Sequence, residues 1–142
     1  MPERKTVARA RRLKREGKAP TTQAGEFVRE EIEHVREGKH GARSTKQAIA
    51  IGLSKARRAG VKLKPPKKGQ ASARTRKSAS RAYRAGQSGR KKTSARRSRA
   101  TLRALKREPR RAASRKALSK QARSAARRRR RRASDMGVAG PR

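Results

Sequence analysis

The side chains best suited to chemistry in this sequence are two histidines and the carboxylates around them. His34 and His40 are the only histidines, and Glu30 and Glu37 lie near them in the sequence. A metal ion needs several convergent ligands, which this pattern does not predict. The carboxylates are also too few, and lie among too many other charged side chains, to indicate acid–base catalysis. We therefore expect no metal, no cofactor and no enzymatic activity.

Lysine and arginine favour a different kind of chemistry. The 142 residues include 47 Lys and Arg against 9 Asp and Glu, which gives a formal net charge of +38. Self-repulsion at such a charge opposes compaction, so the chain needs a polyanionic partner. A basic excess of this size is the electrostatic footprint of a nucleic-acid binder. A membrane partner is not expected, because the chain has no Trp, one Phe and one Tyr with which to build an amphipathic anchor.

Charge and apolar residues divide the chain at Pro65 and Pro66. Residues 1–64 hold 18 basic and 7 acidic side chains and most of the large apolar ones, whereas residues 65–142 hold 29 basic and 2 acidic. Low hydrophobicity with high net charge is typical of disorder. We predict an all-α protein with three parts, namely a small helical head at residues 1–64, a Pro/Gly/Ser/Lys-rich linker at 65–92, and an Ala/Arg-rich basic tail at 93–142 that is largely disordered or conditionally helical.

The head is predicted to contain three helices, at residues 6–16, 24–37 and 44–59. Each is followed by a glycine that favours helix termination, at Gly17, Gly38 and Gly60. Thr21 or Thr22 is expected to cap the second helix. Ser44 and Gln47 match the capping box at the start of the third. Ala48 and Gly52 would let a neighbouring helix approach the third one closely.

Two stretches of the tail have helix-forming composition, at residues 93–107 and 111–133. Residues 127–132 are six consecutive arginines, and like charges four residues apart oppose a helix. Phosphate neutralisation would remove that penalty. We expect disorder in the free tail and some helix when it is bound.

We expect phosphate contacts from basic and polar residues of the third helix, the linker and the tail. A helix-turn-helix, with the third helix in the major groove, is one hypothesis for the head. A plain helical hairpin that holds the phosphate backbone is the alternative. The predicted nucleic-acid-binding residues are Arg43, Ser44, Lys46, Gln47, Lys55, Arg57, Arg58, Lys67, Lys68, Arg90, Lys91, Lys92, Arg96, Arg97, Arg110, Arg111, Arg127, Arg128, Arg129, Arg130, Arg131 and Arg132.

An acidic stripe is predicted along the second helix, because its glutamates are spaced i, i+4, i+7 and i+11. The stripe comprises Glu26, Glu30, Glu33 and Glu37. It is a candidate docking face for a basic partner or a second copy of the chain. The alternative is an internal counter-charge for the first helix or for Arg57 and Arg58.

The segment from Glu26 to Gly60, which includes REEIEHVREGKHGARSTKQAIAIGLSKARRAG, resembles an uncharacterised family of small, very basic bacterial proteins. The resemblance covers roughly the first 65 residues, implies DNA binding and supplies no catalytic residues. The Ala/Arg/Ser tail is similar in composition to bacterial histone-H1-like proteins. We expect a nucleoid-associated, cytoplasmic protein that binds duplex DNA largely without regard to sequence. Alternatives are an RNA- or ribosome-associated protein and an adaptor that recruits a partner through the acidic stripe, and weak self-association through the head stays open.

Overall fold

The structure is a computed structural model that describes residues 2–88 and 94–135. In chain order its elements are α1 (Arg4–Arg15), α2 (Pro20–Arg36), α3 (Thr45–Arg58), α4 (Ala73–Gln87), α5 (Ala95–Lys106), the 3₁₀ helix η1 (Arg111–Ala113) and α6 (Arg115–Asp135). Within the described ranges there is no strand, only an isolated bridge between Lys68 and Ala71. The predicted all-α class is confirmed. None of the helices in these ranges has the length and apolar character needed to cross a membrane.

The three helices predicted in the head are present, and local sequence explains where they begin and end. Gly17, Gly38 and Gly60 follow them with φ of 77°, 79° and 100°, a conformation that glycine adopts without a steric cost. The predicted cap of α2 is wrong. This helix begins at Pro20, whose fixed φ suits the first helical position, so both threonines lie inside its first turn.

The predicted cap of α3 is present in a modified form. The Ser44 hydroxyl accepts a hydrogen bond from the Gln47 backbone N–H at 3.1 Å. The Gln47 side chain reaches back one residue further than in a capping box and accepts from the Arg43 N–H at 2.6 Å. Both bonds satisfy backbone donors that would otherwise lack a partner at the start of the helix.

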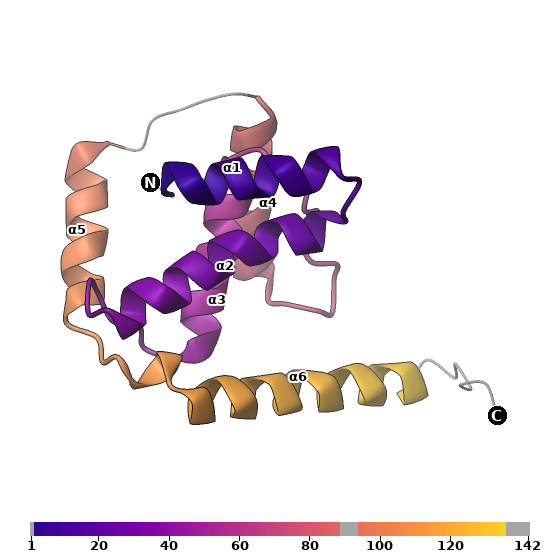
Figure 1. Ribbon diagram of the computed structural model, residues 1–142. Helices are drawn as coiled ribbons and strands as arrows, with labels where there is room; N and C mark the ends of the chain where they lie inside the picture. Colours follow the sequence, from indigo (N-terminus) through magenta and orange to yellow (C-terminus); the bar gives the residue numbers. More distant parts are fainter. Residues whose placement is uncertain (1, 89–93, 136–142) are drawn as a thin grey trace.

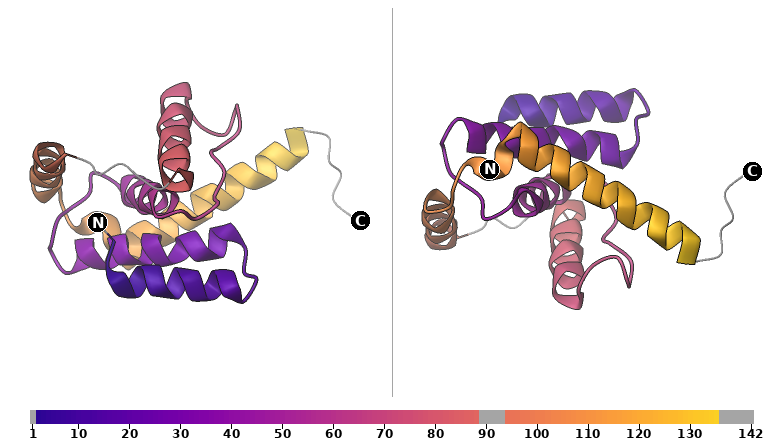
Figure 2. Two further views of the ribbon diagram at one scale, coloured as in Figure 1. Left: turned by 90° about the horizontal axis from the view of Figure 1, so that it is seen from above. Right: turned by 90° about the horizontal axis from the view of Figure 1, so that it is seen from below.

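The helices of the head form layers around α3. Figures 1 and 2 show α1 and α2 side by side, with α3 between α2 and α4. Gly52 makes the crossing of α2 and α3 close, because a Cβ atom there would lie 2.6 Å from the Cα of Val28. The prediction that Gly52 allows close helix approach is confirmed.

Two small apolar clusters hold these layers together. The first joins α1, α2 and α3 and consists of Ala10, Ala24, Phe27, Ala56 and Val61, with Val7, Leu53 and Leu63 packed against it. The second joins the C-terminal half of α2 to α3, η1 and α6. It consists of Ile32, Val35, Ala42, Ala48, Ala112 and Ala113, with Val28 and Leu118 packed against it. The second cluster therefore takes residues from the predicted tail.

Helix α4 lies in the range for which we predicted a linker, and it packs against α3. Its contact face is made of small residues. Ala79 and Ala82 are buried, and a Cβ atom at Gly86 would lie 1.8 Å from the carbonyl oxygen of Arg57. Because these residues are small, the face does not produce a pattern of large apolar side chains in the sequence.

The prediction of a long disordered tail is wrong for residues 94–135, which form α5, η1 and α6. The two stretches predicted to have helix-forming composition, at 93–107 and 111–133, correspond to α5 and to η1 with α6. Residues 105–113 are held to the loop before α3 by backbone hydrogen bonds from Gly41 N–H to Leu105 O at 2.8 Å and from Ala42 N–H to Pro109 O at 3.0 Å. Thr45 Oγ1 also donates to Ala112 O. These bonds and the burial of Ala112 and Ala113 fix the segment from which α6 begins.

Candidate nucleic-acid interface

Helix α6 carries more lysines and arginines than any other helix that the structure describes. Ten of its 21 residues are Lys or Arg, Asp135 is its one acidic residue, and it buries no residue. In Figure 2 its C-terminal half projects beyond the other helices. At 1.5 Å per residue the helix is about 30 Å long. The helix therefore forms a cationic rod that is almost as long as one turn of duplex DNA.

The predicted contacts at residues 127–132 all lie on this rod. Arg127, Arg129, Arg130, Arg131 and Arg132 are exposed. Arg128 is half-buried, and its Nη1 donates to Ser124 Oγ at 2.9 Å. Six consecutive helical positions point in all directions around the axis, so the end of α6 is cationic on every side.

Helices α1, α4 and α5 carry the most exposed cations after α6, and most of these were not predicted from the sequence. Those of α1 are Arg4, Lys5, Arg9, Arg11, Arg12, Lys14 and Arg15; those of α4 are Arg74, Lys77, Arg81 and Arg84; those of α5 are Arg96, Arg97, Arg99, Arg103 and Lys106. Only Arg96 and Arg97 were predicted. The charge density of 7 cations in the 12 residues of α1 was the available signal.

Helix α3 is covered on two sides, by α2 and by α4, with η1 and α6 near its start. Arg43 and Ser44 are exposed before it and Gln47 is half-buried. Along α3 itself, all of which is described, the exposed cations are Lys46 and Arg58 at opposite ends. A recognition helix needs a continuous exposed face of polar side chains. This environment therefore gives the helix-turn-helix hypothesis no support.

Two of the predicted contact residues have internal roles. Lys55 Nζ pairs with the buried carboxylate of Glu31. Arg57 is 7% exposed and donates from Nε to Leu63 O at 3.0 Å and from Nη2 to Lys64 O at 3.2 Å. Burial lowers the pKa of Arg57 from its ordinary value, but a guanidinium stays protonated in proteins. Arg57 thus holds the chain that returns over α3, and its prediction as a surface contact is corrected.

The remaining predicted cations are spread over the molecule. Lys67, Lys68, Arg110 and Arg111 are exposed. Arg90, Lys91 and Lys92 lie outside the described residues.

An open cavity of about 350 Å³ lies where the predicted tail meets α2. Arg36, Arg110, Ala113, Ser114 and Arg115 line it. Arg36 Nε donates to Ala113 O at 2.9 Å, and Arg110 Nη2 donates to Arg36 O at 2.7 Å. The first turn of α6 begins at this cavity, with the Ser114 hydroxyl accepting from Ala117 N–H at 3.1 Å. Three guanidinium groups beside a helix N-terminus form a surface suited to a phosphate.

The acidic stripe is divided between α1 and local partners. Glu30 is buried, and its Oε1 accepts from Glu3 N–H at 2.6 Å and from Thr6 Oγ1 at 3.1 Å. Glu26 pairs with Arg9 of α1 at 3.9 Å. Glu33 pairs with Arg29 at 3.3 Å and Glu37 with Lys39 at 3.4 Å. Glu26 and Glu30 thus face α1 and do not form part of an open docking face.

Two pKa shifts accompany these pairs at the end of α2. A hydrogen bond with His34 lowers the pKa of Glu3, and its neighbours Lys5 and Lys39 act in the same direction. The Glu37 carboxylate raises the pKa of Lys39. The carboxylates of this region are therefore matched locally by cations and imidazoles, away from the cationic rod.

One comparison with known proteins bears on the head. Residues 4–68 match DUF6496, a family of unknown function. The matched segment comprises α1 to α3 and the chain that returns over α3. The expected resemblance of the head to an uncharacterised family is confirmed, whereas the match does not show the basic, bacterial or histone-H1-like character that we expected. No curated protein and no solved structure matches the chain.

Proposed function

We propose that the protein binds duplex DNA largely without regard to sequence, by neutralising phosphates with the cations of its outer helices. The observation that carries this proposal is α6, with ten cations on a projecting helix that buries no residue. Each phosphate contact releases condensed counterions, which favours binding without any contact to a base. Six adjacent arginines would repel one another in a free helix, so a polyanion also stabilises this element.

The separation of charge supports the same function. Five of the nine acidic residues lie between positions 26 and 37, in or directly after α2. Most of the exposed cations of the described helices lie on α1, α4, α5 and α6, which surround α2 and α3. Phosphate backbone is therefore attracted to the outer helices and repelled from the centre of α2.

Seating one phosphate in the cavity beside Arg36, Arg110 and Arg115 would place the backbone at the start of α6. From there the backbone can continue along the rod towards residues 127–132. The arginines of the rod favour bidentate phosphate contacts and insertion into a minor groove. A protein of this kind would coat DNA and, by contacting a second duplex with its cationic end, compact it as nucleoid-associated and histone-like proteins do.

Duplex is preferred to single strands in this proposal because few aromatic groups are free to stack on bases. Phe27 is 1% exposed in the first apolar cluster, and Tyr83 is half-buried on α4. Proteins that bind single strands depend on such stacking.

The proposal is tested by fluorescence anisotropy with a labelled duplex at fixed salt. We expect two unlabelled duplexes of unrelated sequence to compete equally, and single-stranded DNA to compete less well. Structured RNA in the same assay separates the proposal from RNA binding, because a clear preference for RNA would overturn it.

The contribution of α6 is tested by replacing all six arginines at 127–132 with glutamine. Glutamine keeps the helix propensity and removes the charge. We expect duplex affinity to fall roughly a hundredfold at physiological salt. The matched control replaces the same six residues with lysine, which keeps the charge, and should retain most of the affinity. Equal affinity of the glutamine variant and the unmodified protein would contradict a role for α6.

A further inference from the structure

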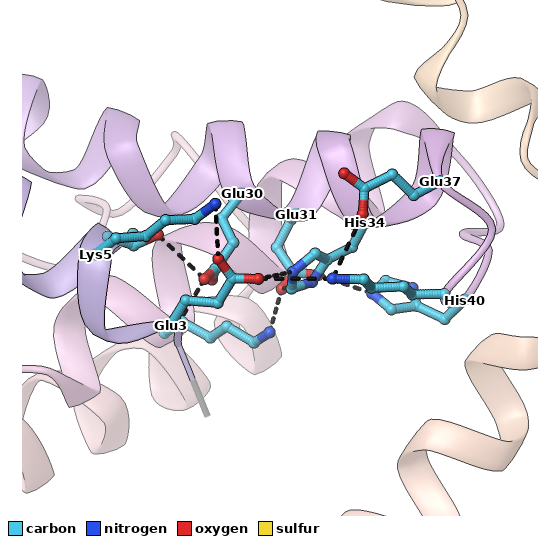
Figure 3. Close-up of polar contacts among 10 residues, drawn as sticks. Glu3, Lys5, Glu30, Glu31, His34, Glu37 and His40 are labelled. Atoms are coloured by element: carbon cyan, nitrogen blue, oxygen red, sulfur yellow. Dashed lines mark hydrogen bonds and ion pairs between the residues drawn. The ribbon is translucent and has the colours of Figure 1, made fainter.

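Four side chains converge between the N-terminus, the second half of α2 and the loop that follows it. Figure 3 shows Glu3, Glu31, His34 and His40 pointing towards one another. Glu31 is 0% exposed, His40 7% and His34 14%. One ligand atom from each of Glu31, His34 and His40 can be chosen so that all three lie within 4.8 Å of one another. The sequence pattern did not reveal this group because we considered Glu30 and Glu37 rather than Glu31.

The hydrogen bonds of the two imidazoles determine which nitrogen of each faces Glu31. His40 Nδ1 lies 2.9 Å from the carbonyl oxygen of Gly41, which can only accept, so Nδ1 carries the proton. His34 Nε2 lies 3.3 Å from the Glu3 carboxylate, which also accepts, so Nε2 carries the proton. In the neutral rings, His40 Nε2 and His34 Nδ1 therefore have free lone pairs.

These two lone pairs face the buried carboxylate. His40 Nε2 is 3.2 Å from Glu31 Oε2, and His34 Nδ1 is 3.9 Å from Glu31 Oε1. Lys55 Nζ forms an ion pair with Glu31 Oε1. Glu31 Oε2 is buried and accepts no hydrogen bond from any residue that the structure describes. A buried acceptor without a partner is costly, and opposed lone pairs repel. A cation between Oε2 and the two imidazole nitrogens would remove both costs.

We propose that Glu31, His34 and His40 bind a divalent transition metal ion, with Zn²⁺ as the preferred ion. Two imidazoles and one carboxylate are ligands that suit zinc. Each histidine has its other ring nitrogen bonded to an oxygen, which is the outer-shell arrangement that orients metal-binding histidines. Tetrahedral ligands around zinc lie roughly 3.3 Å apart, so small side-chain rotations close the site.

The ion would join α2 to the loop at residues 38–44. That loop carries Arg43, and its Gly41 and Ala42 N–H groups donate the backbone hydrogen bonds that hold residues 105–113. Metal binding would therefore stabilise the base from which α6 projects. This site is separate from the proposed DNA interface, and it is tested without DNA.

The test uses the full chain without a histidine tag, because its two histidines are then the only ones present. Zn²⁺ is titrated by calorimetry, and the imidazole nitrogens are followed by long-range ¹H–¹⁵N NMR. We expect one ion per chain and protons on His40 Nδ1 and His34 Nε2 before zinc is added. On addition of zinc, His40 Nε2 and His34 Nδ1 should show the large shifts of metal ligands.

Variants separate this site from adventitious binding. His40→Gln and Glu31→Gln should abolish the calorimetric signal, and Glu3→Gln should weaken zinc binding about 10- to 100-fold. The matched control is Glu33→Gln, on the same helix but paired with Arg29 at the surface, which should leave zinc binding unchanged.

Three results would overturn the proposal. They are the absence of zinc uptake by the unmodified chain, uptake that survives in His40→Gln, and imidazoles that bear the opposite tautomers and do not respond to zinc. Because the NMR measurement uses the unmodified protein, the proposal stays testable even if Glu31→Gln fails to fold.

Discussion

Neighbouring arginines at the end of α3 show that equal charge does not mean an equal role. Arg57 is buried and bonded to two carbonyl oxygens of the returning chain, whereas Arg58 is exposed. The first orders the head, and the second is available to a phosphate. Burial and hydrogen bonding, rather than residue type, separate the structural cations from those that we propose to bind phosphate.

This difference predicts opposite effects of two alanine substitutions. Arg57→Ala leaves Leu63 O and Lys64 O without their donor and should lower the free energy of unfolding by about 1–3 kcal/mol. Arg58→Ala should change it by no more than about 0.5 kcal/mol. Urea unfolding followed by circular dichroism measures both. Equal loss of stability in the two variants would show that the bonds of Arg57 contribute nothing specific.

At the scale of elements, the contacts between helices rely on glycine and alanine. Gly52 brings α2 and α3 together, Gly86 brings α4 onto α3, and Gly41 lets the loop before α3 pass residues 108 and 109. Such contacts bury little area per residue, and large apolar groups add only two small clusters. The arrangement therefore depends on backbone fit.

The docking of residues 105–113 is the element-scale contact that can be tested most sharply. A Cβ atom at Gly41 would lie 1.7 Å from Glu108 O, a backbone atom that cannot move alone. Gly41→Ala should break the backbone bonds to Leu105 and Pro109 and cost the docked state about 1–3 kcal/mol.

Hydrogen exchange measures this loss. The amides of Gly41 and Ala42 and those of the first turn of α6 should exchange faster in Gly41→Ala, while α1 to α3 stay protected. Gly25→Ala is the control, because a Cβ atom there meets nothing within 4 Å. If Gly41→Ala exchanged like the control, residues 105–113 would not be docked as described.

The helices differ in how far the sequence predicts them. Helices α1 to α3 were predictable because glycine stops, the Ser44 cap and a periodic apolar face act within a few residues. Helix α4 was not, because Ala79, Ala82 and Gly86 carry its packing and do not stand out from the composition. The docked tail was missed because it is held by backbone bonds and by Ala112 and Ala113.

The sequence predicts which residue types form the candidate interface, but not which individual cations are free to take part in it. The arginines at 127–132 are on the surface because a run of charges cannot be buried. The internal roles of Lys55 and Arg57 were not predictable, because they depend on Glu31 and on the returning chain. The histidine and glutamate group was missed because Glu31 was not considered as a partner of the histidines, and because His40 and Glu3 reach the group from outside α2.

At the scale of the whole molecule, acidic groups are gathered around α2 and cations extend outward. Most of the lysines and arginines that the structure describes lie on α1, α4, α5 and α6, helices that bury few residues or none. Such a molecule resists compaction by its own repulsion and gains stability from a polyanion. The proposed function therefore depends on electrostatic association with the phosphate backbone.

The salt dependence of duplex binding tests this claim most directly. Between about 50 and 200 mM salt, we expect affinity for duplex DNA to fall by roughly 10³-fold or more, as it does when about six or more phosphates are neutralised. Glutamine at all six positions 127–132 should make the slope of log K against log salt shallower by up to about 5. A duplex affinity that does not change with salt, or no binding at physiological ionic strength, would contradict the account.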